Sequence, residues 1–505
     1  MNENLNTAGG MACFVVFMII GVVAIQLTHH RETRRQQTQL FLLSYLIRTA
    51  MVAAVYYFGL INIIKDEDSA GWIGGLGLYN SWVEQGHTVF TLPSAIYDYI
   101  KMMTENSGTD GGRLHIGYFI ILAVEFYFTN APGRIPAAML NVLVGSWVPV
   151  LVYRLSMQIF DNPRAARYAG LTLALMPSLV LFSAQTLKEP FVVFLEVLGL
   201  YSCVQICQLK IRLRYVLSLM IASMTVYYLR YYVLYVFAGT LFLSLTIPLV
   251  FKSKFRDAFI VLGFLTSPLV FLVAYQSAID ELTEIKNDQT RRLMAYRDGF
   301  GQGDNLQSSS NVDNPFDITV TSQLIPGFLF GFVHLMYSPL PWHLAKGSLR
   351  MLLTAPEMLW WYYNGTLRLY RGLREGWRIN KADMLLPALF IAPLIFFYSL
   401  IFNNIGLAYR YRAQVLPELM LFVSLGYHQV RIYLQNYNYS EMQYDEIEPE
   451  FPAQPRWNPY PNHGPMNSPS PFMANKSMPN WPQQPTWTGR RNSNGPNNSN
   501  SFQDF

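Results

Sequence analysis

Long, nearly uncharged apolar runs dominate the chain, and the polar residues gather between these runs instead of alternating with them. A run of roughly 20 apolar residues can cross the hydrocarbon core of a bilayer as an α-helix. Two apolar segments, 114–130 and 319–338, are short or interrupted. The firmer runs cover about residues 11–28, 40–64, 135–160, 165–185, 190–208, 215–229, 231–250, 257–275, 352–370, 383–403 and 413–431. The pattern predicts an all-α polytopic membrane protein with about 11–13 transmembrane helices.

Short basic loops between the runs predict the orientation of the chain, because such loops favour the cytoplasmic side. The basic loops are 29–37, 161–167, 210–214, 252–256 and 371–381. All five are cytoplasmic if the eleven firmer runs cross, the N-terminus lies outside and the C-terminus lies inside. The two short segments are then re-entrant or interfacial on the outer side. The first run is a retained helix in this reading, because no cleavage site follows a short apolar region.

This topology gathers four segments on the outer side. They are a large first loop, the turn after Lys188 and Glu189, and the segments 276–351 and 403–412; the large loop covers 65–134. After about Glu441 the chain becomes rich in Pro, Asn, Ser and Gln, with scattered Trp. Such a composition cannot bury enough apolar surface to fold alone, so it predicts a disordered cytoplasmic tail.

Composition agrees with a membrane protein and excludes several other classes. Hydrophobic residues make up 51% of the 505 residues and charged residues only 14%, against about 25% charged in soluble proteins. The net charge of +5 comes from basic residues at the ends of apolar runs, so it indicates no nucleic-acid partner. The three cysteines all lie within apolar runs and imply neither a disulfide framework nor a metal site.

Acidic residues stand where the second run ends, in the stretch LINIIKDEDSAGWIGG. Asp66, Glu67 and Asp68 would begin the large outer loop, where a carboxylate can serve as a general base. Crowding raises the pKa of some members of such a group. A solvated loop edge is the alternative. Glu189, in LKEP, is a further catalytic candidate at similar depth, although its place in the first turn of a helix is equally explained by the helix dipole. Lys188 beside it is a candidate for substrate binding, although it can also simply extend to the surface.

Three arginines stand at predicted outer helix ends, where the orientation rule disfavours them: Arg230, Arg410 and Arg412. Arginine binds phosphate through two parallel hydrogen bonds, and the phosphate of a lipid-linked sugar would lie at this depth. Anchoring to lipid headgroups is the alternative. Arg412, closer to the final helix, is the favoured ligand. Trp342 and His343, in YSPLPWHLAKG, could stack on a sugar, although interfacial tryptophans are common without any ligand.

The ordered set of motifs resembles the GT-C superfamily of membrane glycosyltransferases. The similarity is to protein O-mannosyltransferases and aminoarabinose transferases, in the manner of glycosyltransferase family 39, over about residues 40–430. It is carried by Asp68 with Trp72, by RLHIGYF and the following Leu-Asn helix up to LKEP, and by YRYRAQVLPEL; the matched positions include His115, Gly117, Tyr118, Asn141, Pro177, Glu189, Arg410 and Arg412. The departures are Trp72, where the family more often has tyrosine, the additional helix 11–28, and the long tail without a folded domain.

The resemblance implies transfer of a hexose or pentose from a polyprenyl-phosphate donor to a glycan, lipid or protein acceptor. The reaction would take place at the outer face of the plasma or inner membrane, in assembly of the cell envelope. The resemblance assigns the outer-loop acids to the acceptor, the arginines to the lipid phosphate, and His115 and Tyr118 to substrate binding. Members differ in whether they use a divalent cation, so Mg²⁺ or Mn²⁺ stays open. The resemblance divides the chain into three parts. They are an extra N-terminal part (1–38), a catalytic membrane domain (39–435) and a tail (436–505).

A transporter, flippase or polymerase of lipid-linked glycans would also place basic residues around a lipid phosphate. Transporters often show internal repeats and ionisable residues at mid-membrane depth. The chain shows no convincing repeat, and the main charges well inside the runs are Arg48, Glu125 and Glu196. Glycosyl transfer is therefore the preferred hypothesis, with transport as its alternative.

Overall fold

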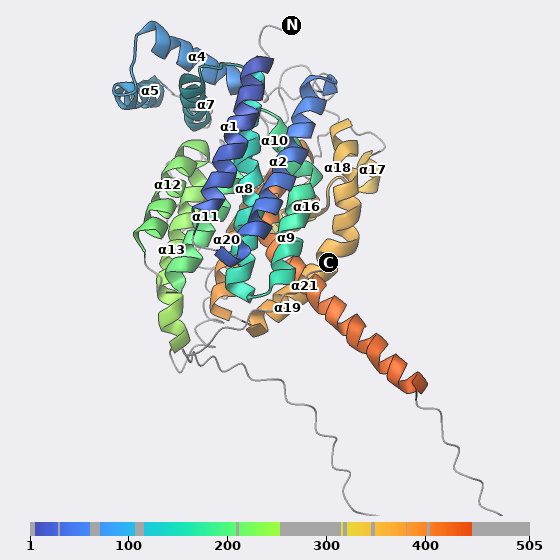
Figure 1. Cartoon of the computed structure of the whole chain (residues 1–505). Helices are drawn as coiled ribbons and strands as arrows, with labels where there is room; N and C mark the ends of the chain where they lie inside the picture. The colour runs from blue at the N-terminus through green and yellow to red at the C-terminus, as the bar shows by residue number, and fades with distance from the viewer. Residues whose placement is uncertain are drawn as a thin grey trace, which may run out of the picture. The chain divides into compact units, whose positions relative to one another are not determined.

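The computed structural model contains only helices and connecting turns in the part of the chain that it describes (Figure 1). The described residues are 6–28, 31–60, 71–106, 116–208, 212–252, 315–316, 321–344, 349–379, 381–400 and 405–446. The helices are α1 (Thr7–Gln26), α2 (Arg34–Tyr56), α4 (Gly71–Glu84), α5 (Leu92–Asn106), α7 (Ile116–Thr129), α8 (Arg134–Phe160), α9 (Pro163–Leu175), α10 (Pro177–Ala184), α11 (Glu189–Cys207), α12 (Leu213–Leu229), α13 (Tyr231–Lys252), α16 (Thr321–Tyr337), α17 (Pro341–Leu344), α18 (Leu349–Trp360), α19 (Thr366–Ile379), α20 (Lys381–Leu400) and α21 (Ile405–Glu446).

Several of these helices are long and apolar enough to cross a membrane. Five pass by themselves: α1, α2, α8, α11 and the part of α20 from Asp383 to Leu400. The pair α9 and α10, which is bent by 50°, makes up to six. The chain is therefore an all-α polytopic membrane protein, as predicted. The count of 11–13 spans is not reached in the described ranges, where α7 and α12 are shorter and the predicted run 257–275 is not covered.

Proline explains why one predicted span, 165–185, is a broken helix. Met176 adopts an extended backbone with ψ of 116° between α9 and α10, as expected for a residue before proline. Pro177 then begins α10, where its missing N–H costs nothing. The break exposes the last carbonyl groups of α9 inside the protein, and these need donors from elsewhere.

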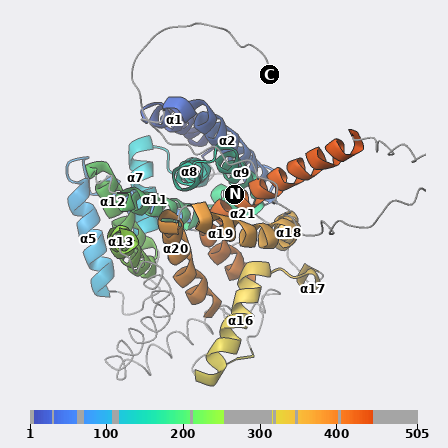
Figure 2. The same cartoon turned by 90° about the horizontal axis from the view of Figure 1, so that it is seen from below.

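Helix α8 lies at the centre of the bundle, packed against α1, α2, α9, α10 and α11 (Figure 2). The predicted extra helix, α1, is part of this packing. A methyl group on Gly10 would lie 2.4 Å from the side chain of Ile135 in α8. The hydroxyl of Tyr45 in α2 donates to the carbonyl of Phe14 at 2.9 Å. The segment 1–38 therefore contributes to the membrane bundle through its helix.

The chain divides after Met442 into two units, Met1–Met442 and Gln443–Phe505. The predicted disordered tail, 436–505, begins a few residues before this boundary. Its first residues, 436–446, are helical, because helix α21 continues to Glu446. The rest of the predicted tail lies outside the described residues.

The helices α4 and α5 lie at the end of the bundle where α1 begins, whereas α19 lies at the other end (Figure 1). This arrangement agrees with the prediction that the first large loop and the basic segment 371–381 face opposite sides. The absolute orientation stays a prediction. Cysteines introduced at Ser69 and Ser493 are expected to react with an impermeant thiol reagent from opposite sides of intact cells. The background should be low because Cys13, Cys203 and Cys207 are buried. Labelling of both positions from outside would contradict the topology.

Close helix contact should make Gly331 intolerant of any side chain. A methyl group there would lie 1.8 Å from the carbonyl oxygen of Ser399, so α16 and α20 would have to separate. We expect Gly331→Ala to lower the free energy of unfolding by about 1–3 kcal/mol, measured by chemical denaturation in detergent. Gly239→Ala in α13 is the matched control, since no atom lies within 4 Å of its added methyl group. Equal stability of the two variants would contradict this packing.

Candidate functional site

The candidate site is built on the turn Gln185–Lys188, which joins α10 to α11. Glu189 is the first residue of α11 and Pro190 follows it in the first turn. Proline is favoured at this position and fixes where the helix starts. The carboxylate at the helix N-terminus also interacts favourably with the helix dipole. The local sequence therefore holds Glu189 at the start of a predicted span, where it is buried.

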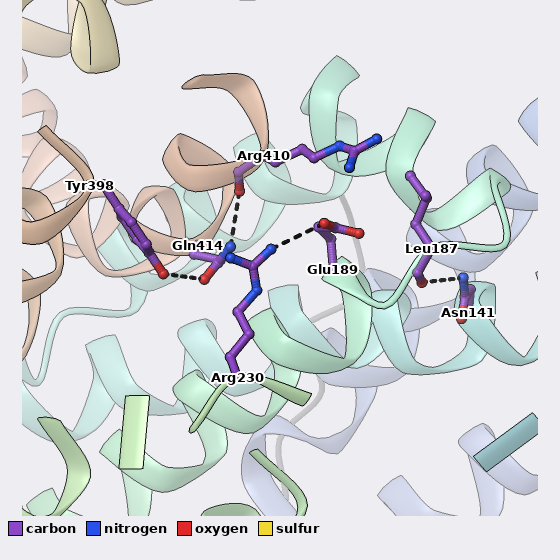
Figure 3. A network of polar contacts seen from close by, with 7 residues as sticks. All are labelled: Asn141, Leu187, Glu189, Arg230, Tyr398, Arg410 and Gln414. Carbon is purple, nitrogen blue, oxygen red and sulfur yellow. Dashed lines mark hydrogen bonds and ion pairs between the residues drawn. The ribbon is translucent and has the colours of Figure 1, made fainter. Parts of the chain in front are cut away.

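Arg230 reaches the same point from the end of α12 (Figure 3). Its Nη2 lies 3.2 Å from Oε1 of Glu189, and both side chains are almost fully buried. The guanidinium also lies over the ring of Tyr411, at 5.5 Å from the ring centre. The structure thus joins two residues that are 41 positions apart and that the sequence analysis assigned separately to the base and to the phosphate.

Two further cationic groups surround Glu189. Arg410 and Lys188 both lie close enough to act electrostatically on its carboxylate. Arg410 is half-buried, and its side chain extends beside Glu189 in Figure 3. We call Glu189, Arg230, Arg410 and Lys188 the Glu189 cluster. Four of the predicted site residues therefore come together at one place.

Asn141 and Tyr118 hold the turn in position. The amide Nδ2 of Asn141 donates to the carbonyls of Gln185 at 2.6 Å and Leu187 at 2.8 Å. It also lies 3.2 Å from the hydroxyl of Tyr118. Both side chains are buried. Tyr118, which the resemblance assigns to substrate binding, therefore uses its hydroxyl inside the protein and supports the turn that carries Glu189.

Arg412 lies elsewhere, although it is only two positions from Arg410. Its Nη2 lies 3.5 Å from Oε1 of Glu357, and its Nη1 donates to the carbonyl of Ser338 at 2.6 Å. Only 1% of Arg412 is exposed. Two residues of α-helix rotate by about 200°, so the two arginines must face different neighbours. The preference for Arg412 as the phosphate ligand is thus not supported by its surroundings.

The acids of the outer loop and one predicted substrate-binding residue lie outside the described residues. These are Asp66, Glu67, Asp68 and His115. The chain resumes at Gly71, where a methyl group would lie 3.3 Å from the carbonyl of Thr186 and 3.1 Å from the ring of Tyr118. Helix α4 therefore begins against the turn of the Glu189 cluster. Trp72, the aromatic residue of the matched motif, is buried in the main hydrophobic core.

Trp342 and His343 form part of α17, apart from the Glu189 cluster. Trp342 is 65% exposed, and its ring lies 5.8 Å from that of His343. The Nδ1 atom of His343 accepts a hydrogen bond from the backbone of Leu340 at 3.2 Å. Burial and the neighbouring His334 lower the pKa of His343, which keeps it neutral at pH 7. The hydrogen bonds and ring contacts described for these two residues connect them to Leu340, to His334 and to each other.

Arg48 is a buried arginine that the sequence analysis noted only as a charge inside a run. It is 1% exposed and donates to the hydroxyl of Ser183 at 3.2 Å. It also donates to the carbonyls of Ala174 at 3.3 Å and Leu173 at 3.4 Å. These carbonyls belong to the broken end of α9, so Arg48 supplies donors that the break requires. An arginine within an otherwise apolar run was the available signal.

A small cavity lies between Arg48 and the Glu189 cluster. Its walls include Arg48, Ser183, Glu189 and Ala413. The space is about 10 Å³, which corresponds to about one water molecule. A methyl group on Gly145 would lie 2.3 Å from Oγ of Ser183, so glycine is required beside this cavity. The cavity is too small for a sugar or a phosphate.

Among the side chains that the structure describes, no three His, Cys, Asp or Glu residues gather as a metal site. The acids of the outer loop are not among these described side chains.

No protein-family model matches the chain, and comparisons with curated proteins and with solved structures found no match. The fold and the site define the class: a membrane protein whose described residues form only helices and turns, with a buried glutamate and converging cationic groups at one end of the helices.

Proposed function

We propose that this protein is a membrane glycosyltransferase that transfers a sugar from a polyprenyl-phosphate donor to an acceptor hydroxyl with inversion. The observation that carries the proposal is the convergence of Arg230, Arg410 and Lys188 on Glu189. The start of α4, which directly follows the acidic stretch in the sequence, packs against the same turn. Cationic and acidic groups are the two kinds of side chain that this reaction requires.

The cationic groups would stabilise the departing lipid phosphate. Charge builds on that phosphate as the bond to the sugar breaks, and preorganised donors are most effective where charge develops. A phosphate leaving group needs positive charge more than it needs a general acid. Arg410 is the best candidate for direct contact, because it is half-buried beside Glu189 whereas Arg412 binds Glu357.

Glu189 would position the arginines instead of acting as the base. Its carboxylate binds Arg230 at 3.2 Å, and proton abstraction would require this ion pair to be broken. The proposed base is Asp68, with Asp66 and Glu67 adjusting its pKa or holding a divalent cation. Asp68 precedes Gly71 by three residues, and three residues span at most about 11 Å.

Arginine-to-lysine variants distinguish phosphate binding from structural roles. Lysine keeps the charge but lacks the planar fork that matches two phosphate oxygens. We expect Arg410→Lys to reduce both turnover and apparent donor affinity, because the contact strengthens in the transition state. We expect Arg412→Lys to reduce thermal stability. The measurement is transfer of a labelled sugar from a polyprenyl-phosphate donor by purified protein.

The matched control is Arg371→Lys on α19, an exposed arginine that lies at the opposite end of the bundle from α4 in Figure 1. It should change neither transfer nor stability. If Arg410→Lys transfers sugar normally, the phosphate contact belongs to another residue, and Arg230 is next. If Arg412→Lys loses turnover but keeps its stability, Arg412 binds the phosphate, as the sequence analysis predicted.

A transporter of lipid-linked glycans is the second candidate, favoured by one observation. Glu196 and Glu418 are buried deep within helices α11 and α21, and ionisable residues at such depth are typical of transport pathways. Neutralising Asp68 separates the two functions. Catalysis predicts that Asp68→Asn loses transfer while the protein is still expressed and still binds the lipid donor. A transporter would move the intact donor across the bilayer with or without Asp68.

A further inference from the structure

Two glutamates lie below the Glu189 cluster, on the helices that carry Glu189 and Arg410. Glu196 follows Glu189 by seven residues in α11, a rise of about 10.5 Å along that helix. Glu418 follows Arg410 by eight residues in α21, a rise of about 12 Å. Residues separated by seven or eight positions share one helix face. Each glutamate is therefore about two turns deeper than its partner in the cluster.

Polar and aromatic groups connect the cluster to this depth. The hydroxyl of Tyr398 in α20 donates to Oε1 of Gln414, one turn before Glu418. The ring of Tyr398 stacks on that of Tyr411 at 4.4 Å with the planes nearly parallel. Tyr411 in turn lies beneath the guanidinium of Arg230. Figure 3 shows Gln414 between Tyr398 and Arg230.

The two carboxyl groups have no side-chain hydrogen-bond partner among the described residues. This holds for both oxygens of Glu196 and for both oxygens of Glu418. The exposed fractions are 0% for Glu196 and 1% for Glu418, so bulk water does not satisfy them either. Burying one such charge without a partner is strongly unfavourable, and the usual result is that the group takes up a proton.

The electrostatic surroundings make this argument stronger. Among the described residues, the charged groups close enough to act on Glu196 are Glu418 and Arg230. Arg230 forms an ion pair with Glu189 at 3.2 Å. When ionised, Glu418 carries the same charge as Glu196 and therefore opposes its ionisation. Tyr398 of α20 and Arg410 of α21 belong to the polar groups above the pair. Like charges that act on each other in a medium of low dielectric constant oppose joint ionisation.

We propose that Glu196 and Glu418 form a proton-binding site inside the membrane bundle, placed beneath the Glu189 cluster. A metal cation would need several oxygen ligands at 2.0–2.6 Å, roughly six for Mg²⁺ or Ca²⁺. A proton needs only one oxygen to bind and one to accept its hydrogen bond. The proposal does not depend on glycosyl transfer, and a proton held here would equally serve a transport function.

The test uses full-length protein in nanodiscs and infrared difference spectroscopy of the carboxylic acid C=O band. The wild-type protein should show this band at neutral pH, and the part of the band that comes from Glu196 and Glu418 should titrate in two coupled steps. Glu196→Gln and Glu418→Gln should each remove part of the band and leave a single step. The double variant should lose the whole signal of the pair.

Glu125→Gln is the matched control. Glu125 of α7 is another buried carboxyl group without a described hydrogen-bond partner, so its own contribution to the band should disappear while the two-step titration remains. If the single glutamine variants leave the band unchanged, the proposal is wrong. If a glutamine variant fails to fold, aspartate at the same position must shift the band, and an unshifted band would equally overturn the site. Because the readout is spectroscopic, its failure is distinct from failure of sugar transfer.

Discussion

Asp68→Asn is expected to reduce sugar transfer by about 10²–10⁴-fold, the usual contribution of a general base. Asparagine keeps the size of aspartate and much of its hydrogen bonding, but it cannot accept the proton of the acceptor hydroxyl. Donor affinity should change little, because the proposed phosphate contacts lie on α12 and α21. The measurement is single-turnover transfer from a labelled polyprenyl-phosphate sugar.

The control for this variant is Asp98→Asn, an exposed acid of α5 in the same predicted outer loop. It should transfer sugar at the wild-type rate. If Asp68→Asn is active and Asp66→Asn is not, the role of base moves to Asp66. Near wild-type activity of both variants would remove the outer-loop acids from the chemistry.

Loss of the Arg412 side chain should have the largest effect on stability. Arg412→Met leaves Glu357 buried, with the backbone N–H of Ser178 at 2.8 Å as its described hydrogen-bond donor. Removing one partner of a buried ion pair typically costs about 3–5 kcal/mol, whereas replacing both by apolar residues is often nearly neutral. We therefore expect Arg412→Met to be strongly destabilised, and the double variant with Glu357→Met to recover part of the loss.

Arg410→Met is the comparison variant for this experiment. Arg410 is half-buried, so its removal should change the free energy of unfolding much less, while sugar transfer should fall. Unfolding is measured by denaturant titration in detergent. A stable Arg412→Met protein, or a double variant less stable than either single one, would contradict the assignment of Arg412 and Glu357 as a structural pair.

Hydrophobic runs were enough to predict the helices that are long and apolar by themselves, such as α1, α8 and α11. They could not show that 165–185 is bent, because the consequence of Pro177 depends on what packs around the break. Arg48 provides donors to carbonyls more than 120 positions away in the sequence. Such a pairing depends on tertiary contact, and local sequence patterns do not contain it.

The candidate site was predicted in part. The predicted topology placed Glu189, Arg230 and Arg410 on one side of the membrane, and the structure brings them together. The separation of Arg410 from Arg412 could have been inferred from helix geometry alone, since two positions differ by about 200°. The identity of the ion-pair partner of Arg412 could not be inferred in this way, because Glu357 lies in a run whose composition indicates only an apolar segment. The supporting role of Tyr118 likewise depends on Asn141 of another helix.

Transfer by the purified, reconstituted protein tests the proposed activity most directly. The protein is incorporated into liposomes with a panel of polyprenyl-phosphate sugars carrying a labelled hexose or pentose, and with candidate glycan, lipid and protein acceptors. We expect label to move to one acceptor with inversion at the anomeric carbon. We expect Asp68→Asn to slow this transfer by about 10²–10⁴-fold while the lipid donor stays bound. Movement of the intact lipid donor across the bilayer without any transfer, by folded wild-type protein and Asp68→Asn alike, would contradict the account and favour a transporter.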